Sequence, residues 1–322
     1  MRSEHADTFA ALRTAMNIRI EHLTKSYGPQ KAVDDISFEV RPGEVLGFLG
    51  PNGAGKTTTM KMICGLSAPD SGVIEVGGRN IHSDLEAVRK RIGFLPENNP
   101  LYEDMPVLDY LRFTARVQGV KGALIDQRLR EMVEVCGLGP EKHKRIGELS
   151  KGYRQRVGLA QAMVHDPEVL ILDEPTTGLD PNQIVEIREL IKEVGRAKTV
   201  IFSTHILPEV EATCDRILII NRGRIVADGA PDLLRKQAQG RDVLRARIED
   251  GGRDAVVTAL AALPSVEVAD PVAGAENLFD LQCRSAAQRE IFRLCVEKGW
   301  TLTELRTLET RLEDVFRDLT LN

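Results

Sequence analysis

Hydrophobic and polar residues alternate near the start of the chain, first at positions 18 and 20 and again at 36, 38 and 40. A period of two residues is typical of β-strands that have one covered face. A short apolar stretch at 73–76, followed by Gly77 and Gly78, predicts a further strand that ends in a turn. We therefore expect antiparallel β structure at the beginning of the chain.

The hydrophobic pattern changes around residue 50. Residues 44–49 form an almost continuous apolar run, residues 50–56 are rich in glycine, and residues 57–66 carry apolar side chains at helical spacing. This succession predicts a strand, a glycine-rich loop and a helix.

A long helical region is predicted after this unit. Apolar positions recur at helical spacing in 107–117, 125–135 and 157–164, so we expect residues 98–165 to form an all-helical insertion.

Short buried strands are then predicted at 169–172 and 199–202, separated by a helix over 183–194. Alternating strands and helices indicate a parallel sheet. A hairpin over 217–226 is expected to close this body.

The last ninety residues show another order of elements. The pattern predicts strand 243–248, helix 253–262, strands 265–269 and 277–283, helix 286–298 and strand 301–306. This βαββαβ order is that of a small ferredoxin-like unit. A final helix is expected over 309–319.

The expected organisation has three parts. Residues 1–16 form an N-terminal extension, residues 17–230 form an α/β domain that contains the helical insertion, and residues 240–322 form an α+β accessory domain. No apolar run approaches the roughly 20 residues of a membrane-spanning helix, and the first sixteen residues lack the apolar core of a secretory signal. We therefore expect a cytoplasmic protein.

Composition and charge agree with a folded, globular chain. Charged residues make up 28% and hydrophobic residues 42% of the sequence, which excludes collagen-like and largely disordered chains. The formal net charge of −5 provides no overall positive field for nucleic acid or anionic lipid. The five cysteines lie far apart and form no CxxC pair, so we expect buried thiols rather than disulfides or a zinc site.

The glycine-rich loop carries the strongest chemical signal. The segment GPNGAGKT at 50–57 matches G-x-x-x-x-G-K-[ST], between a predicted strand and a predicted helix. Glycines allow backbone N–H groups to surround a phosphate at the helix N-terminus. Lys56 would reach the β and γ phosphates, and the Thr57 hydroxyl would bind Mg²⁺. The expected nucleotide ligands in this segment are Gly50, Pro51, Asn52, Gly53, Ala54, Gly55, Lys56, Thr57 and Thr58. By itself, this loop predicts only a protein that binds a nucleoside triphosphate.

Two adjacent carboxylates end the predicted strand at 169–172. At a strand end the chain turns, so Asp173 and Glu174 can approach one site although neighbouring strand residues face opposite ways. Asp173 is placed to hold Mg²⁺, and Glu174 to orient and deprotonate the attacking water. The simpler interpretation is a solvated acidic pair in a turn.

The segment LSKGY at 149–153 resembles the LSGGQ signature of the ATP-binding cassette (ABC) ATPases. Leu149, Ser150 and Gly152 match the signature, whereas Lys151 and Tyr153 depart from it. Ser150 is also expected to be the N-cap of the following helix.

Further matches to this family extend over residues 18–229. Tyr27 resembles the aromatic residue on which adenine stacks, and the segment TGLD, which ends in Asp180, resembles the D-loop. His205 resembles the switch histidine that contacts the γ phosphate. Glu97 stands where most members carry glutamine. We count it, with Thr57 and Asp173, among the expected Mg²⁺ ligands.

The resemblance implies a fold and a function. The fold is a P-loop NTPase core with an antiparallel β subdomain and a helical insertion, followed by the small ferredoxin-like domain. The activity is ATP hydrolysis coupled to transport, with ATP and Mg²⁺ bound and with Lys56, Glu174 and His205 as the catalytic residues. Ser150 and Gly152 would meet the ATP of a second copy, so that two chains form a homodimer around two ATPs. Asp180, in the D-loop segment, is counted among the nucleotide-binding residues.

Two segments are similar to the ABC-2-type exporter group, whose ATPases work with a separate membrane permease. One is LPENNPLY at 95–102, similar to gliding-motility-associated components, and the other is LEDVFRDLT at 312–320. The resemblance places the protein at the inner face of the cell membrane, with the permease docked near residues 97–111 and with no direct nucleic-acid partner.

Two other functions remain open from the sequence. One is a soluble ABC ATPase that acts on ribosomes or nucleic acid, although such proteins usually carry two cassettes. The other is a small-molecule kinase or GTPase, which accounts for the glycine loop but not for LSKGY or His205.

Overall fold

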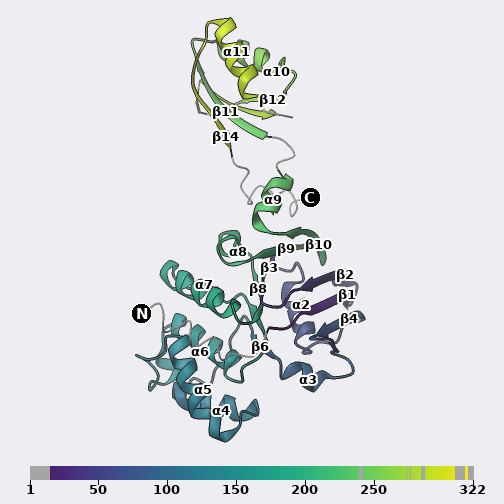
Figure 1. The fold of residues 1–322 in the computed structure, drawn as a ribbon, viewed down its shortest axis with the longest axis vertical. Coiled ribbons are helices and arrows are strands. Elements are labelled where there is room, and N and C mark those ends of the chain that lie inside the picture. Colours follow the sequence, from purple (N-terminus) through teal and green to yellow (C-terminus); the bar gives the residue numbers. More distant parts are fainter. Residues whose placement is uncertain are drawn as a thin grey trace. The chain divides into compact units, whose positions relative to one another are not determined.

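The computed structural model describes residues 15–238, 242–272, 274–275, 277–283, 287–308 and 316–317. It divides into two compact units, residues 1–231 and 232–322, which are described separately (Figure 1). Most of the N-terminal extension and nearly all of the helix expected at 309–319 lie outside the described residues.

The first unit contains an antiparallel sheet of four strands in the order β2-β1-β4-β5. The strands are β1 (Ile18–Tyr27), β2 (Gln30–Val40), β4 (Ser71–Val76) and β5 (Arg79–Asn80). Residues 18, 20, 36, 38 and 40 are all buried, so the predicted alternation marks the covered face of this sheet. Met16, assigned above to the extension, packs against the same core.

A six-stranded sheet in the order β10-β9-β3-β8-β7-β6 forms the centre of the unit. Its strands are β3 (Val45–Leu49), β6 (Ile92–Leu95), β7 (Val169–Asp173), β8 (Thr199–Thr204), β9 (Arg216–Asn221) and β10 (Arg224–Gly229). All pairs are parallel except the predicted hairpin of β9 and β10. Strands β3, β7 and β8 are buried along their whole length, as expected for a parallel sheet covered on both faces.

Helices pack against this sheet or against a helix beside it. They are α2 (Lys56–Ile63), α3 (Leu85–Arg89), α4 (Val107–Val117), α5 (Gly122–Val135), the 3₁₀ turn η1 (Ile146–Glu148), α6 (Lys151–Met163), α7 (Pro181–Gly195) and α8 (Leu207–Thr213). Helices α4 and α5 pack against α6, which lies beside the sheet. Helix α9 (Pro231–Ala238) follows β10. The predicted helical insertion is present as α4, α5, η1 and α6, which gather at one end of this unit in Figure 1.

The register of the parallel strands determines where the site forms. Leu49 at the end of β3 pairs with Thr204 at the end of β8, and Asp173 at the end of β7 pairs with Ser203. The loops that follow these three strands therefore emerge side by side, at the carboxyl edge of the sheet where α/β proteins bind ligands.

The second unit has its own core and its own sheet. Its elements are β11 (Asp242–Glu249), α10 (Arg253–Ala261), β12 (Val266–Pro271), β13 (Leu278–Cys283), α11 (Gln288–Lys298) and β14 (Thr301–Leu308). The strand order β12-β13-β11-β14, with every pair antiparallel, is that of the predicted ferredoxin-like arrangement. Its core includes Leu244, Phe279 and Ile291.

All five cysteines are free and buried. Among the described residues, no helix combines the length and the apolar character needed to cross a membrane.

Candidate functional site

The glycine-rich loop joins β3 to α2. Gly53 and Gly55 have φ values of +79° and +108°, a left-handed backbone that glycine adopts without strain. A Cβ at Gly50 would lie 2.4 Å from the Ile220 carbonyl, so the loop also needs glycine for close packing. Helix α2 has no acidic residue in its first turn and no side-chain cap. Its N-terminal N–H groups therefore form an electropositive end suited to phosphate.

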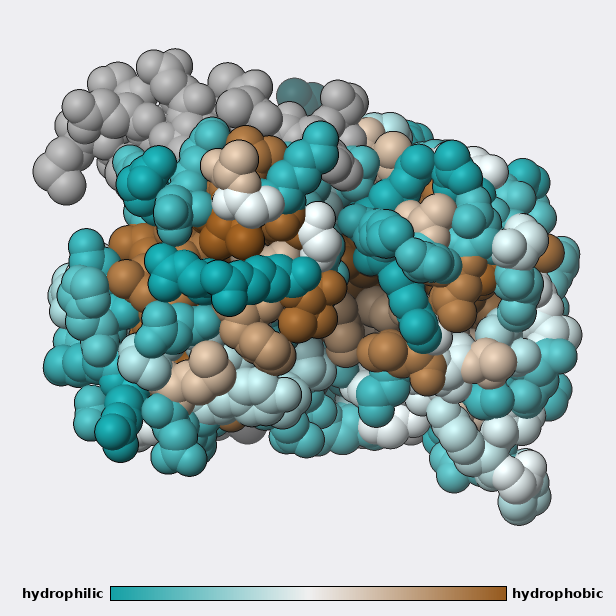
Figure 2. Space-filling model, turned by 90° about the horizontal axis from the view of Figure 1, so that it is seen from below, coloured by the Kyte–Doolittle hydropathy of each residue, from teal (hydrophilic) through white to brown (hydrophobic). Residues whose placement is uncertain are grey.

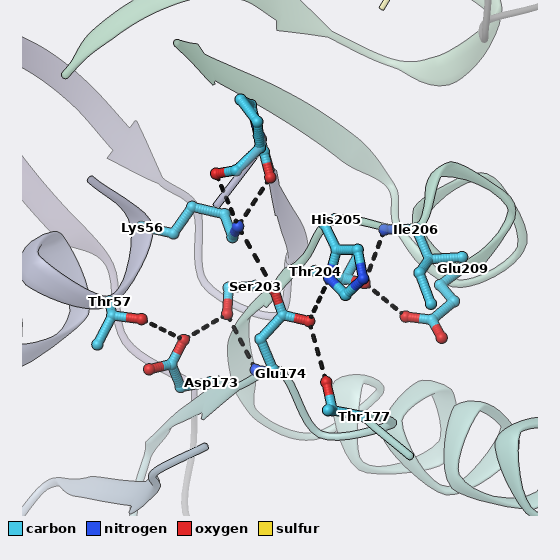
Figure 3. A network of polar contacts seen from close by, with 12 residues as sticks. Lys56, Thr57, Asp173, Glu174, Thr177, Ser203, Thr204, His205, Ile206 and Glu209 are labelled. Atoms are coloured by element: carbon cyan, nitrogen blue, oxygen red, sulfur yellow. Dashed lines mark hydrogen bonds and ion pairs between the residues drawn. The ribbon is translucent and has the colours of Figure 1, made fainter. Parts of the chain in front are cut away.

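The Lys56 side chain is almost fully buried and crosses this loop. Its ammonium donates to the carbonyls of Gly50 at 2.7 Å and Pro51 at 3.3 Å, and it lies 3.4 Å from Glu174 Oε1 (Figure 3). The lysine thus connects the glycine loop of β3 with the acidic end of β7.

The two predicted carboxylates do approach one site, as Figure 3 shows. Asp173 Oδ1 accepts hydrogen bonds from the Thr57 hydroxyl at 3.1 Å and the Ser203 hydroxyl at 2.6 Å. Glu174 turns its carboxylate toward Lys56 because its backbone is left-handed, with φ at +50°. Such a conformation is uncommon for a residue other than glycine and is often found at functional sites.

His205 lies immediately after β8, beside Glu174. Its Nδ1 is 3.0 Å from Glu174 Oε2, which also accepts a hydrogen bond from the Thr177 hydroxyl at 3.3 Å. Glu174 is 6% exposed, whereas the His205 side chain is 44% exposed. The imidazole can therefore meet a ligand while the carboxylate stays within the protein.

A cavity of about 390 Å³ opens over the glycine loop and Glu174, while Asp173 and His205 are not among the residues that line it. Its walls include the loop residues Asn52 to Thr58, together with Tyr27, Glu97 and Glu174. Tyr27 is 55% exposed and offers a ring face on which a base can stack. The cavity has the size and the chemistry of a nucleotide site: backbone N–H groups, one lysine, hydroxyls and an aromatic ring.

Three other predicted ligands lie on the helices α6 and α7. Ser150 is the N-cap of α6 and accepts from the Tyr153 N–H, and Asp180 is the N-cap of α7 and accepts from the Gln183 N–H. Gly152 packs so closely on Gln183 that a Cβ would lie 2.5 Å from that side chain. Within the described part of the chain, none of these three residues lines the cavity. The structure thus brings one group of the predicted residues together and leaves the signature group apart.

The donors near the phosphate loop fit a Mg²⁺ ion. Thr57 and Asp173 place two oxygens within hydrogen-bond distance of each other beside the loop, and oxygen is the ligand that Mg²⁺ prefers. Glu97 adds a carboxylate to the wall of the same cavity. No cluster of three or more histidine, cysteine or acidic side chains with metal-binding geometry occurs among the described residues, so an ion here would also need phosphate oxygens.

Ser203 was not among the predicted site residues. Its hydroxyl donates to the Asp173 carboxylate and accepts from the Glu174 N–H at 3.0 Å, so it holds the side chain of Asp173 and the backbone of Glu174. The available signal was a hydroxyl two residues before His205, at the end of a buried strand. A nearby thiol takes no part, because burial, reinforced by the charge of Asp173, raises the pKa of Cys64 and keeps it protonated.

Comparisons with known proteins agree with this geometry. A family model described as ABC transporter matches residues 33–177, and one described as AAA domain, putative AbiEii toxin, Type IV TA system, matches residues 145–210. The bacitracin transport ATP-binding protein BcrA of Bacillus licheniformis is 35% identical over 93% of this chain and 95% of its own length.

Two further relatives match different lengths of this chain. The Nod factor export ATP-binding protein I of Paraburkholderia xenovorans is 38% identical over 94% of this chain and 96% of its own length, so the similarity includes the second unit. A solved structure of cbiO1 from Clostridium perfringens, described as part of the ABC transporter complex cbiONQ, is 30% identical. It covers 69% of this chain and 91% of that one, with a TM-score of 0.63.

Proposed function

Because the chain belongs to the ABC transporter family of ATP-binding proteins, we propose that two copies of it close around two ATPs and drive export through a separate permease. Membership of the family makes the chain an ATP-binding subunit that hydrolyses ATP. The proposal concerns the residues that act, the dimer, the metal, the direction of transport and the position at the membrane.

One observation supports the proposed dimer. The cavity over Lys56 is bounded by the glycine loop and Glu174, whereas Ser150 and Gly152 lie at the start of α6, away from its walls. Two copies arranged head to tail about a two-fold axis would bring the signature of each to the cavity of the other. Each ATP would then be held by two chains, and loss of its γ phosphate would release their contact.

The roles within one cavity follow from its contacts. Lys56 would neutralise the β and γ phosphates, since its ammonium already lies at the centre of the loop. Glu174 would orient the attacking water and accept its proton, and His205, which contacts Glu174, would meet the γ phosphate. Mg²⁺, held by Thr57 and Asp173 with Glu97 nearby, would supply further charge neutralisation.

Nucleotide-dependent dimerisation tests the proposal. Glu174→Gln preserves the shape of the side chain but removes the proton acceptor, so the variant should form a stable dimer with ATP and Mg²⁺ in light scattering. The same variant carrying Lys56→Ala should stay monomeric because it cannot hold the triphosphate. A Glu174→Gln chain that binds ATP and remains a monomer would contradict the proposal and favour a kinase-like function.

Export is supported by the relatives' names and by the extent of the match. Bacitracin transport and Nod factor export are named for proteins that this chain covers almost end to end. These names also favour transport over a soluble role at ribosomes or nucleic acid. Co-purification with a polytopic membrane protein, rather than sedimentation with ribosomes, is the expected outcome in cell extracts.

An aromatic cluster on α4 provides the proposed permease contact. Tyr102, at the end of the segment after Glu97, packs on Tyr110 and Phe113 with ring centroids 5.8 Å apart in both pairs. Tyr102 is 57% and Phe113 42% exposed. Figure 2, which views the chain from the side where α4 and α5 lie, shows apolar side chains in hollows between hydrophilic ones. A cytoplasmic helix of the permease is the proposed occupant.

A matched pair of substitutions tests this contact. Phe113→Ser should reduce co-purification of the permease without lowering ATP binding, since Phe113 lies outside the cavity walls. Phe292→Ser, at an exposed phenylalanine of α11 in the second unit, should leave co-purification unchanged. An equal effect of both substitutions would contradict the assignment of the α4 cluster.

A further inference from the structure

A buried carboxylate lies behind His205 and belongs to none of the predicted motifs. Glu209, in the first turn of α8, is 2% exposed. Its Oε2 accepts a hydrogen bond from the Thr204 hydroxyl at 2.7 Å, and the same hydroxyl accepts from the Ile206 N–H at 3.0 Å (Figure 3). One carboxylate therefore reaches, through one hydroxyl, the two residues on either side of His205.

The contact differs from ordinary helix capping. In a capping box, the acidic residue of the first turn accepts directly from the N–H of the N-cap residue. Here Ile206 is the N-cap residue of α8, but its N–H goes to Thr204, which in turn donates to Glu209. Capping of α8 alone would not need the Thr204 hydroxyl between the Ile206 N–H and the Glu209 carboxylate. Because this hydroxyl belongs to the last residue of β8, it connects the end of β8 to α8 on both sides of His205.

Packing does not fix the His205 ring, because 44% of its side chain is exposed. Its position depends instead on the backbone at Thr204 and Ile206 and on the 3.0 Å contact between Nδ1 and Glu174 Oε2. Thr204 is fully buried, so the anchoring point is rigid. A displacement of about 1 Å at a reacting group can cost on the order of 100-fold in rate.

We propose that Glu209, acting through the Thr204 hydroxyl, is a positioning residue for His205 in ATP hydrolysis. This inference rests on the role proposed above for His205 at the γ phosphate. Glu209 contacts neither the cavity nor the carboxylate of Glu174 within the described chain, so its effect passes through the backbone at 204–206.

Two substitutions at Thr204 form the primary test. Thr204→Val keeps the volume of the side chain but removes the hydroxyl, and we expect kcat to fall about tenfold with little change in KM for ATP. Thr204→Ser keeps the hydroxyl and loses a buried methyl group, so it should be less stable in thermal melts yet retain most of kcat. Thr204→Val also leaves the buried Glu209 carboxylate without this hydrogen bond, so both variants are assayed at a temperature at which each is folded. A purely structural role then predicts equal kcat values for the two variants.

A double-mutant cycle tests whether Glu209 acts through the histidine. Glu209→Leu should lower kcat like Thr204→Val, whereas Glu209→Gln, which keeps an oxygen acceptor for Thr204, should retain most activity. On a His205→Ala background, Glu209→Leu should have no further effect on the residual rate, because residues that act as one unit are not additive.

Distinct outcomes would overturn the inference. Equal kcat values for Thr204→Val and Thr204→Ser, or an undiminished effect of Glu209→Leu on the His205→Ala background, would contradict it while leaving the proposed function intact. A wild-type chain that shows no turnover with ATP and Mg²⁺ would contradict the proposed function and this inference together.

Discussion

Glu174 combines strain with several contacts at a single position. Its left-handed backbone costs on the order of 1 to 3 kcal/mol. The conformation is maintained by the Ser203 hydroxyl on its N–H and by Lys56, Thr177 and His205 around its carboxylate. Strain held in place by surrounding contacts is expected where the position of a side chain matters more than local stability.

The role proposed for Glu174 predicts a large effect of its substitution on turnover. Glu174→Gln should lower kcat by about 10² to 10⁴ because the substitution removes the proposed general base, while ATP binding is retained. Glu189→Gln, at an exposed position of α7, serves as the control and should keep the wild-type rate. Turnover of Glu174→Gln near the wild-type value would assign the base to another residue.

A second residue-scale prediction concerns pH. Burial lowers the pKa of His165 to about 4, and its Nε2 lies 3.2 Å from the Ile92 carbonyl. The unfolded chain, with a pKa near 6.5, binds the proton more readily, so stability falls as pH decreases from about 6.5 to 4. The full loss is on the order of 3 kcal/mol, because one pKa unit corresponds to about 1.4 kcal/mol.

Urea unfolding at several pH values checks this prediction. His165→Gln should lose less stability than the wild type over that pH window, since glutamine does not titrate. The exposed His143 provides the matched control, and His143→Gln should follow the wild-type curve. Parallel curves for His165→Gln and wild type would show that His165 does not carry the effect.

The residues of the sequence motifs were predictable from the sequence, whereas the residues that hold them in place were not. Lys56, Asp173 and Glu174 occur in local patterns that have a chemical reason. The Ser203 contact joins β8 to β7 and exists because Asp173 pairs with Ser203 in the sheet register, whereas the contact of Glu209 with Thr204 depends on how α8 turns back after β8. A single sequence does not state that register.

At the scale of elements, one glycine controls how β6 meets the helical insertion. A Cβ at Gly93 would lie 2.1 Å from the Ala162 carbonyl of α6 and 2.9 Å from Pro167. The strand and the helix therefore approach each other through backbone, and β6 leads directly to Glu97 and the loop of the proposed permease contact.

Gly93→Ala should destabilise the first unit by about 1 to 3 kcal/mol, because the added methyl group meets backbone that has no space to yield. Gly139→Ala adds the same methyl group in open space and should have little effect. Denaturant midpoints of the two variants check the difference. Equal midpoints would contradict the close approach of β6 and α6.

Elements with a clear hydrophobic period or a continuous apolar run were predicted, and several short elements without such a pattern were not. The expected helix at 107–117 is α4, and the expected strand at 169–172 is β7. Strand β6 and helices α3 and α8 were missed because four to seven residues carry too few apolar positions to establish a period. Their form is imposed by the sheet against which they pack.

At the scale of the whole molecule, the two units have separate cores and separate sheets. The alternation of strands and helices predicted a parallel sheet in the first unit and a ferredoxin-like sheet in the second. The order β10-β9-β3-β8-β7-β6 was not predictable, because strands far apart in sequence become neighbours only through tertiary packing.

Because each unit has its own core, we expect the first unit to fold without the second. A chain ended at residue 240 keeps the whole first unit and α9, and it should retain ATP hydrolysis and the ATP-dependent dimerisation of the Glu174→Gln form. Circular dichroism and light scattering check folding and dimerisation. Failure of the shortened chain to bind ATP would show that the second unit completes the site.

The structure of the Glu174→Gln chain crystallised with ATP and Mg²⁺ tests the central claim most directly. Two copies should enclose two nucleotides, with Ser150 of each copy within about 3 Å of the γ phosphate that the other copy's Lys56 holds. The account would be contradicted by an ATP-loaded chain in which Ser150 of neither copy reaches a phosphate.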